Sequence, residues 1–522
     1  MKWFGRRKVL AAAAVFAGLP LAYLTCALAQ RQAARPPRAA KAITVRAGDD
    51  LQRALDAAAP GDEVVLEAGA TFVGNFTLPV KAGASFVTVR SSRLAELPEG
   101  RRVSPSDAAR MARVATPNSG PAILAPPGSH HWRLLGLEIT QAAGRLTYDL
   151  VQLGDGDTEG PQDSAEKAPR HFRIDRCLVR AFDARAPLKR GVALNSAHTE
   201  IINSHVSGAK VAGQDSQAVA GWNGPGPFLI ENNYLEGAGE NILFGGAVSA
   251  ARGLVPSDIT VRRNLVSKPL SWKQGDPAYA GEAWQVKNLF ELKSARRVLV
   301  EANVFENNWA HAQSGFAVVL TVGNDSGAWA QVEDVTFQNN LVRNVAQALN
   351  IRARDDVPGS GLRRVAVRNN LFVGVEGIFL QLLRGAVALT VDHNTVLHGK
   401  TVVAFESAGE GEENEAFAFT NNVLRHNNYG LFGSGGAMGT AALEQFCRRW
   451  RFAGNILAGA DPSKYPPGNL YPPALDPKFF ADAARGDYRL ADPRLRGRAA
   501  DGKDPGCDFD EWRAALAWHL GG

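Results

Sequence analysis

The sequence is poor in the residues that mark several classes of protein. Only four of its 522 residues are cysteine and three are methionine, so the chain is not a small disulfide scaffold. Charged residues make up 21% and hydrophobic residues 45% of the chain. This balance excludes wholesale disorder, a collagen and a multi-span membrane protein. We therefore expect a folded chain with ample material for a core.

Acidic residues are absent from the first 48 positions. Residues 1–41 carry eight Lys and Arg, and removing these eight cations from the net charge of +6 leaves −2 for residues 42–522. The excess of positive charge is therefore confined to the start of the chain. Since the remainder is slightly acidic, the composition argues against nucleic acid as a partner.

The first 29 residues have the pattern of a signal peptide. A basic start precedes an apolar run over residues 9–28, and Ala27-Leu28-Ala29 is an A-x-A cleavage site. Arg6-Arg7 also resembles a twin-arginine export signal. We expect an exported protein, periplasmic or extracellular, in which residues 30–41 form a linker rich in Pro, Ala and Arg.

An uncleaved membrane anchor is the alternative interpretation of the same segment. The apolar run approaches the 20 residues that span a bilayer. Pro20 and the small residues of the cleavage site favour removal. Beyond this segment we expect no contact with a membrane.

A short pattern recurs from residue 137 to residue 455. It consists of a β-branched or aromatic residue, two further residues, an anchor that is mostly Asn, any residue, and a second apolar residue. The anchors are separated by about 32 residues on average, which is typical of the coils of a solenoid with insertions of varying length. The anchor positions are Leu137, Cys177, Ser204, Asn233, Asn264, Asn303, Asn340, Asn370, Asn394, Asn422 and Asn455.

The residues around the anchor indicate the kind of solenoid. The positions three before and two after it are apolar and favour strands, so both face a core. The position between them alternates in charge from coil to coil, as in Glu231, Arg262 and Glu301, which suits parallel strands stacked about 4.8 Å apart. Asn tolerates a left-handed turn between two strands and bonds the backbone of a neighbouring coil, so the Asn column is structural.

The predicted fold is all-β: a single-stranded right-handed parallel β-helix. The spacing matches neither leucine-rich repeats nor propeller blades. We expect an N-terminal cap and first coils over residues 42–131, with a short helix over residues 51–59, and the main β-helix over residues 132–457. A C-terminal capping segment over residues 458–522 ends in a helix after Asp508, which we expect to close the C-terminal end of the core.

Four segments resemble a known superfamily. Residues 47–52, 60–62 and 67–70 are similar to the N-terminal cap of pectate-lyase-like right-handed β-helix proteins, and residues 487–506 are similar to the tail of secreted bacterial-type members. The Asn-anchored coils continue the resemblance over most of the chain. It implies the fold, but the superfamily contains lyases, hydrolases, esterases, epimerases and adhesive proteins without activity.

No branch of the superfamily is identified. The motifs of polygalacturonase-like hydrolases are missing from the coils, where the one Asp-Asp pair, Asp355-Asp356, is typical of a turn. Pectate lyases carry an Arg between prolines on the β-helix, whereas the nearest similar segment of this chain lies in the linker and not on a coil. No catalytic residue is therefore assigned from the resemblance.

Two of the long intervals, 39 and 37 residues, follow Asn264 and Asn303, so insertions lie there. They contain Trp272 and Trp284, among others. Insertions on one side of a β-helix wall a groove, in which Trp stacks on sugar rings or simply packs.

Polar residues of neighbouring strands are expected to share one face beside these insertions. In the segment 287–293, alternation turns every second side chain outward. The strand two coils later and the preceding coil add further polar side chains. The outward residues are Glu240, Lys287, Glu291, Lys293, Asn350, Arg352 and Arg354.

This patch suits β-elimination of a uronate polysaccharide, which requires a neutralised carboxylate, a base and an acid. We expect Arg352 and Arg354 to neutralise the substrate and Lys293, with its pKa lowered by neighbouring cations, to be the base. Calcium held by Glu291 and Glu240 is an alternative neutraliser, although no dedicated calcium loop is present. The predicted catalytic residues are Lys293, Arg352 and Glu291, and the predicted substrate-binding residues are Arg354, Asn350, Lys287, Trp272, Trp284 and Glu240.

Other interpretations stay open. The patch also fits an ordinary ladder of surface ion pairs, so a non-catalytic glycan-binding or surface-scaffold protein is the main alternative and a glycoside hydrolase the third. The partner is a polysaccharide, and we expect a monomer. The histidines lack metal spacing, and whether Cys447 pairs with Cys507 cannot be read from the sequence.

Overall fold

The structure is a computed structural model that describes residues 39–356, 360–406 and 411–520. Its contacts divide the chain into Met1–Ala40 and Lys41–Gly522, and the description below concerns the second unit. The predicted signal peptide lies outside the described residues. In the described part of the chain, no helix is both long and apolar enough to cross a bilayer.

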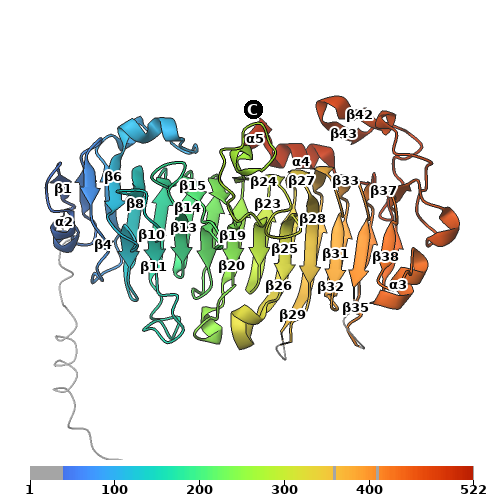
Figure 1. The fold of residues 1–522 in the computed structure, drawn as a ribbon, viewed down its shortest axis with the longest axis horizontal. Helices are drawn as coiled ribbons and strands as arrows, with labels where there is room; N and C mark the ends of the chain where they lie inside the picture. Colours follow the sequence, from blue (N-terminus) through green and yellow to red (C-terminus); the bar gives the residue numbers. More distant parts are fainter. Residues whose placement is uncertain (1–38, 357–359, 407–410, 521–522) are drawn as a thin grey trace, which may run out of the picture. The chain divides into compact units, whose positions relative to one another are not determined.

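Three long parallel sheets, here called sheets A, B and C, run through this unit (Figure 1). Most coils contribute one strand to sheet A, then one to sheet B, then one to sheet C, and strands pair with their equivalents in the neighbouring coils. The single antiparallel pair among the described strands is β42 (Phe480–Asp482) with β43 (Asp487–Leu490). This is the predicted right-handed parallel β-helix.

The strands are short and follow one another around each coil. Sheet A contains β1 (Ala42–Val45), β2 (Glu63–Leu66), β5 (Val87–Ser91), β8 (His130–Leu135), β11 (Arg170–Asp175), β14 (Ala197–Ile202), β17 (Phe228–Glu231), β20 (Ser257–Arg262), β23 (Ala295–Glu301), β26 (Gln331–Gln338), β29 (Gly361–Arg368), β32 (Val387–Asp392), β35 (Asn414–Glu415), β36 (Ala418–Thr420), β39 (Cys447–Arg448) and β40 (Arg451–Ala453). Sheet B contains β3 (Thr71–Val73), β6 (Ala112–Thr116), β9 (Leu137–Gln141), β12 (Leu178–Arg180), β15 (His205–Ala209), β18 (Tyr234–Gly237), β21 (Leu265–Ser267), β24 (Val304–Asn308), β27 (Leu341–Val345), β30 (Leu371–Val375), β33 (Thr395–His398), β37 (Val423–Arg425) and β41 (Ile456–Ala458). Sheet C contains β4 (Phe76–Thr77), β7 (Ile123–Ala125), β10 (Thr147–Leu153), β13 (Leu188–Leu194), β16 (Gln217–Gly221), β19 (Glu240–Phe244), β22 (Asn288–Leu292), β25 (Phe316–Thr321), β28 (Gln347–Arg352), β31 (Leu380–Leu383), β34 (Val403–Glu406) and β38 (Leu431–Gly433).

Short helical turns interrupt the coils between strands. They are η1 (Leu94–Glu96), η2 (Pro105–Arg110), η3 (Arg252–Leu254), η4 (Leu270–Trp272), η5 (Asn324–Trp329), η6 (Pro462–Lys464), η7 (Pro477–Phe479) and η8 (Ala483–Arg485).

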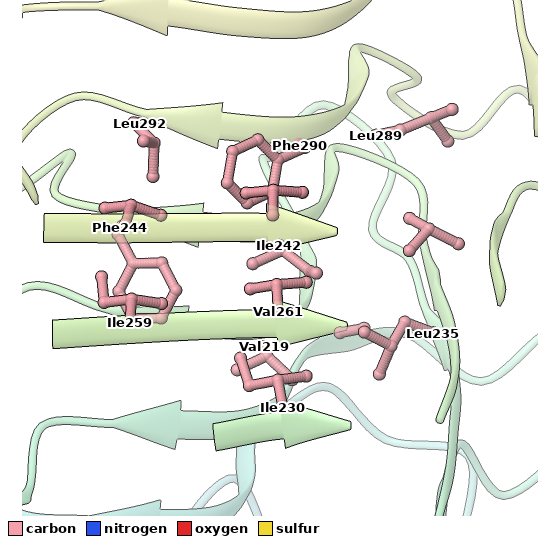
Figure 2. Packing of buried hydrophobic residues seen from close by; sticks show 14 of the residues in the cluster. Val219, Ile230, Leu235, Ile242, Phe244, Ile259, Val261, Leu289, Phe290 and Leu292 are labelled. Carbon is pink, nitrogen blue, oxygen red and sulfur yellow. The ribbon is translucent and has the colours of Figure 1, made fainter. Parts of the chain in front are cut away.

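The core is built from apolar columns that run along the stack of coils. In sheet C, Val219, Ile242 and Phe290 are register partners and all are fully buried (Figure 2). In sheet A, Ile230 and Val261 form the same kind of column opposite them. Because the coils repeat the pattern, one continuous core fills the space between the three sheets.

The anchor asparagines form a hydrogen-bonded ladder at the corner between sheets A and B. The side-chain oxygen of Asn264 accepts the backbone N–H of Asn233 at 2.9 Å, and its amide donates to the Ile230 carbonyl at 2.8 Å. The same pair of bonds recurs up to Asn455. The left-handed backbone conformation falls on the residue before each anchor, as at Asn232 with φ 54°, and not on the anchor itself.

The N-terminal end is capped as predicted. Helix α2 (Leu51–Ala57) begins at Asp50, whose side chain accepts the Arg53 N–H, and it buries Leu51 and Leu55 against the first coils.

The terminal helix does not close the C-terminal end, so this expectation was wrong. Helix α4 (Phe509–Ala515) begins at the predicted cap Asp508, but α4 and α5 (Ala517–Leu520) lie against sheet B beside β24 and β27 (Figure 1). Trp512 is buried there and donates to the Asn340 carbonyl at 3.1 Å. The outer face of sheet B is apolar at Leu341 and Leu371 and needs a cover.

A different helix closes the last coil. Helix α3 (Thr440–Phe446) inserts Leu443 and Phe446 into the core, where the Phe446 ring stacks on Phe405. The cysteine question is also settled for the described residues, because Cys447 and Cys507 are both free and buried.

Candidate active site

The outer face of sheet C carries the polar residues that the sequence singled out. Because Phe290 and Leu292 enter the core, Glu291 and Lys293 turn outward between and beyond them. Glu240 in β19 is the register partner of Asn288 in β22. The structure therefore brings Glu240, Lys287, Glu291 and Lys293 together on adjacent coils.

Lys287 binds Glu240 tightly. Its ammonium lies 2.7 Å from the Asp215 carboxylate and 2.8 Å from Glu240 Oε1. Although burial lowers the pKa of Lys287, the charges of Glu240 and Asp215 raise it well above its usual value. Gln217 donates to the other Glu240 oxygen at 2.7 Å. Glu240 is thus a buried carboxylate that is fixed by an ion pair.

Glu291 has a different environment. Its side chain is only 2% exposed and accepts one bond, at 2.8 Å, from the amide of Asn288. Burial, reinforced by the negative charge of Glu240, raises the pKa of Glu291 to about 7. Both protonation states are therefore populated near neutral pH, which suits a group that transfers protons.

Lys293 is protonated, contrary to the expectation of a lowered pKa. Its ammonium lies 2.6 Å from the Asp325 carboxylate. Burial lowers the pKa of Lys293, but the charges of Glu291 and Asp325 outweigh burial and raise it. The neighbours that dominate are carboxylates, whereas the sequence suggested cations.

Arg352 and Asn350 lie on the same face but two coils away. Arg352 is the register partner of Thr321, and β25 separates it from β22, so it stands about 10 Å from Lys293 along the sheet. Its guanidinium contacts Asp355 at 3.3 Å. Asn350 donates to Gln381 at 2.7 Å.

Arg354 lies beyond the end of β28. It donates to the Gly411 carbonyl at 3.3 Å and its side chain is half-exposed. The two arginines therefore do not touch the Glu291 cluster, although the outer face connects Arg352 with it.

No protein-family profile matches the chain. No curated protein is similar to it either. The solved structures do include similar chains, and all three sheets of this one are parallel. The fold, as the three parallel sheets show, is a parallel β-helix.

Three of these β-helix structures illustrate the likeness. An alginate lyase from Paenibacillus sp. strain FPU-7 is 13% identical, with 84% of this chain and 99% of that chain covered and a TM-score of 0.36. A PL6 family polysaccharide lyase from Pseudopedobacter saltans is 12% identical, with 89% and 99% covered and a TM-score of 0.45. A thermostable α-1,3-glucanase from Streptomyces thermodiastaticus is 12% identical, with 82% and 68% covered and a TM-score of 0.47.

The two predicted Trp residues pack elsewhere on the β-helix. Trp272 and Trp284 are 7% and 6% exposed and cluster with Trp309. They line a cavity of about 400 Å³ together with Lys210 and Glu236, and neither Glu291 nor Lys293 borders it. Packing is thus their observed role, and a stacking role beside Glu291 is not what the structure presents.

Sequence reasoning missed the two aspartates that hold the lysines. Asp215 precedes β16 and Asp325 lies in η5, both in connections outside the repeat. It also missed Lys268, which is fully buried and donates to the carbonyls of Gly237 and Ala238 at 2.6 and 2.9 Å. Burial lowers the pKa of Lys268 to about 7. Its only sequence signal was a lysine directly after an apolar strand.

Several oxygen atoms near Glu291 are of the type that hard cations bind. Gln217 Oε1 and Asn288 Oδ1 are buried and accept no hydrogen bond from any described residue. Together with the carboxylates of Glu240 and Glu291, they are the oxygen ligands that calcium prefers. Among the described residues, no group of three or more His, Cys, Asp and Glu is arranged for a metal ion.

Proposed function

We propose that the chain is an exported β-helix enzyme that cleaves an acidic, uronate-containing polysaccharide by β-elimination on the outer face of sheet C. The observation that carries this proposal is that Glu291, whose pKa is raised to about 7, and Lys293, whose pKa is also raised, lie two positions apart along the chain at the end of β22 and act electrostatically on each other. Such a pair offers a base and an acid at one place.

In the elimination, Glu291 accepts a proton and Lys293 donates one. Ionised Glu291 takes the proton from C5 of the uronate, and the electron pair of that C–H bond forms the C4–C5 double bond. The C4–O bond to the next sugar breaks, and its oxygen takes a proton from the Lys293 ammonium. The proposal assigns the base to Glu291 and not to Lys293, because the raised pKa keeps the lysine protonated.

The substrate carboxylate must be neutralised before C5–H becomes acidic. Arg352 supports this role, because it faces the same side two coils along, is partly exposed and contacts Asp355 at 3.3 Å. Calcium, if bound, would be held by Glu240, Gln217 and Asn288 and would withdraw charge from the same carboxylate, which leaves Glu291 free as the base. Lys287 fixes Glu240 in either case.

A glycoside hydrolase is the second candidate, and one observation favours it. Two buried carboxylates, Glu240 and Glu291, interact strongly enough that the charge of Glu240 helps to raise the pKa of Glu291. A protonated carboxyl beside an ionised one is the arrangement used in glycoside hydrolysis. In that case Glu291 would donate its proton to the leaving oxygen.

The test is an assay of the full purified chain on alginate, pectate, chondroitin and heparin-like polymers, each with added calcium and with a chelator. β-Elimination predicts rising absorbance of unsaturated uronate on at least one polymer, and this rise should fall at least tenfold in Lys293→Ala and Arg352→Ala. New reducing ends without absorbance would replace the lyase with the hydrolase. Retention of polymer without any cleavage would leave a glycan-binding scaffold.

Gln381→Ala is the matched control, because Gln381 shares the outer column of Glu291 three coils away and is not assigned to the centre. It should retain activity within about threefold, since it has no charge to supply. Equal losses in Gln381→Ala and Lys293→Ala would contradict the assignment of the centre.

A further inference from the structure

The outer face of sheet C continues beyond Glu240 toward the N-terminal coils. Four residues there have no part in the centre described above. We call them the N-terminal patch: Tyr148 in β10, Lys189 and Arg190 in β13, and Trp222 directly after β16.

Lys189 is a cation without a counter-ion. Among the described residues, no carboxylate lies within ion-pair distance of its ammonium, in contrast to Lys287 and Lys293. The ammonium lies 5.6 Å from the centre of the Tyr148 ring. Partial burial and the charge of Arg190 lower the pKa of Lys189, so an incoming anion would stabilise its charged form.

Tyr148 offers an aromatic surface beside this cation. Its side chain is 47% exposed, which makes it one of the most exposed large apolar residues of the described chain. An exposed aromatic ring next to a free ammonium matches a pyranose that carries a carboxylate, because the ring packs against the apolar face of the sugar while the charge meets the acid.

The other half of the patch is rigid. Arg190 pairs with Asp149 at 2.8 Å and lies 4.8 Å from the centre of the Trp222 ring. The indole N–H of Trp222 donates to the Gly156 carbonyl at 2.9 Å. The patch is thus organised before any ligand arrives, which reduces the entropy cost of binding.

The patch is continuous with the candidate active site. The register on sheet C runs without a break from Asp149 through Arg190, Gln217 and Glu240 to Asn288. Neighbouring strands are about 4.8 Å apart, so β13 lies within about 15 Å of β22. The carboxylate of Asp215, which binds Lys287, also acts electrostatically on Lys189. A chain molecule laid across the strands would meet both places.

We infer that the N-terminal patch is a binding subsite for an acidic sugar unit that lies several sugar units away from the bond that is cleaved. This subsite makes the protein select long anionic polysaccharides over short ones. The inference rests on the proposed function for its substrate. It adds a specificity role for Lys189 and Tyr148.

The experiment compares long and short substrates of one composition. Lys189→Met and Tyr148→Ala are measured on the polymer that wild type cleaves best and on its trisaccharide. With the polymer, KM should rise about fivefold to tenfold in each variant, with kcat within twofold, because the patch only binds. With the trisaccharide, kcat/KM should be unchanged. Lys464→Met, an exposed lysine of η6, is the matched control and should behave as wild type.

Binding is read independently of cleavage by affinity electrophoresis of the same proteins through gels that contain the acidic polymer or a neutral glucan. Retardation of wild type by the acidic polymer, and its loss in Lys189→Met, would support the subsite even if no polymer is cleaved and the proposed function fails. Unchanged KM and unchanged retardation in both variants would overturn the subsite while leaving the enzyme intact. Equal retardation by the neutral glucan would overturn the choice of an acidic sugar.

Discussion

Two regions of the β-helix bury polar side chains in different ways. At the corner between sheets A and B, the anchor asparagines are fully buried and neutral. On the outer face of sheet C, Glu240 and Glu291 are nearly as buried, at 1% and 2% exposed, but they carry ionisable groups. The first region repeats from coil to coil, whereas the second occurs once.

The asparagine corner satisfies its own hydrogen bonds. Asn303 accepts from the backbone and amide of Asn264 at 2.9 and 3.0 Å, and its own amide donates to the Val261 carbonyl at 2.9 Å. Because each Asn accepts hydrogen bonds from the Asn of the preceding coil, the buried amides are satisfied. The ladder therefore stabilises the stack of coils, although buried amides without partners would destabilise it.

The polar groups around Glu291 are not all satisfied by hydrogen bonds in this way. It holds two carboxylates against Lys287 and Lys293, and it leaves Gln217 Oε1 and Asn288 Oδ1 without a donor among the described residues. Buried charges and unsatisfied acceptors cost stability, and proteins retain them mainly where function requires them. We therefore infer that the functional residues lie on the outer face of sheet C, whereas the asparagines at the corner between sheets A and B have a structural role.

The largest effect is expected from Glu291→Gln, which keeps the shape and removes the titrating group. Cleavage should fall about 10²- to 10⁴-fold, the usual worth of a general acid or base. The variant should fold normally, since Gln avoids a buried charge. The measurement is initial rate on the preferred polymer between pH 5 and 9. A variant that retains more than a tenth of wild-type activity would place the chemistry elsewhere.

The next largest effect is expected at the corner. Asn303→Ala leaves the backbone N–H and part of the amide of Asn264 without an acceptor, which should lower the free energy of unfolding by about 2–4 kcal/mol. Urea unfolding checks this, with Gln338→Ala, a half-buried residue at the same corner, as control. Activity per folded molecule should not change. A stable Asn303→Ala with lost activity would reverse the assignment of the two regions.

The corner could be predicted from the sequence because it repeats. Eight asparagines at a constant register between apolar columns determine strand direction, stacking and burial together, and Ile230 and Val261 lie where the pattern puts them. The shift of the left-handed turn by one residue is the only detail there that differs, and no periodicity could have located it.

The site could be predicted only in part. Alternation along β22 was enough to turn Glu291 and Lys293 outward. The pKa of Lys293 depends on the charge of Glu291 and on Asp325, which lies in a connection that obeys no repeat, so the predicted sign of its shift was wrong.

The same limit applies to the segments outside the coils. Trp272 and Trp284 lie in an insertion whose path no pattern determines, and they pack into a cavity of their own. The terminal helix has a readable cap at Asp508, but a cap fixes where a helix starts and not which surface it covers.

The smallest predicted effect concerns pH and stability, and it tests whether the Glu291 carboxyl is strained by its burial. The folded pKa of about 7 lies above the ordinary value of 4.5, so the folded state holds this proton more tightly than the unfolded state. The stability due to the group is therefore complete below about pH 4.5 and is lost as pH rises through 7. Relative to wild type, Glu291→Gln should gain about 2 kcal/mol between pH 5 and pH 8, measured by urea unfolding at both values. Other titrating groups are common to both proteins and largely cancel in the difference, and Asn350→Ala should show no such trend. If the difference in the free energy of unfolding between the two proteins did not change with pH, Glu291 would titrate as an ordinary carboxyl. The contrast between hydrogen-bonded asparagines at the corner and a strained carboxyl on sheet C would then be contradicted.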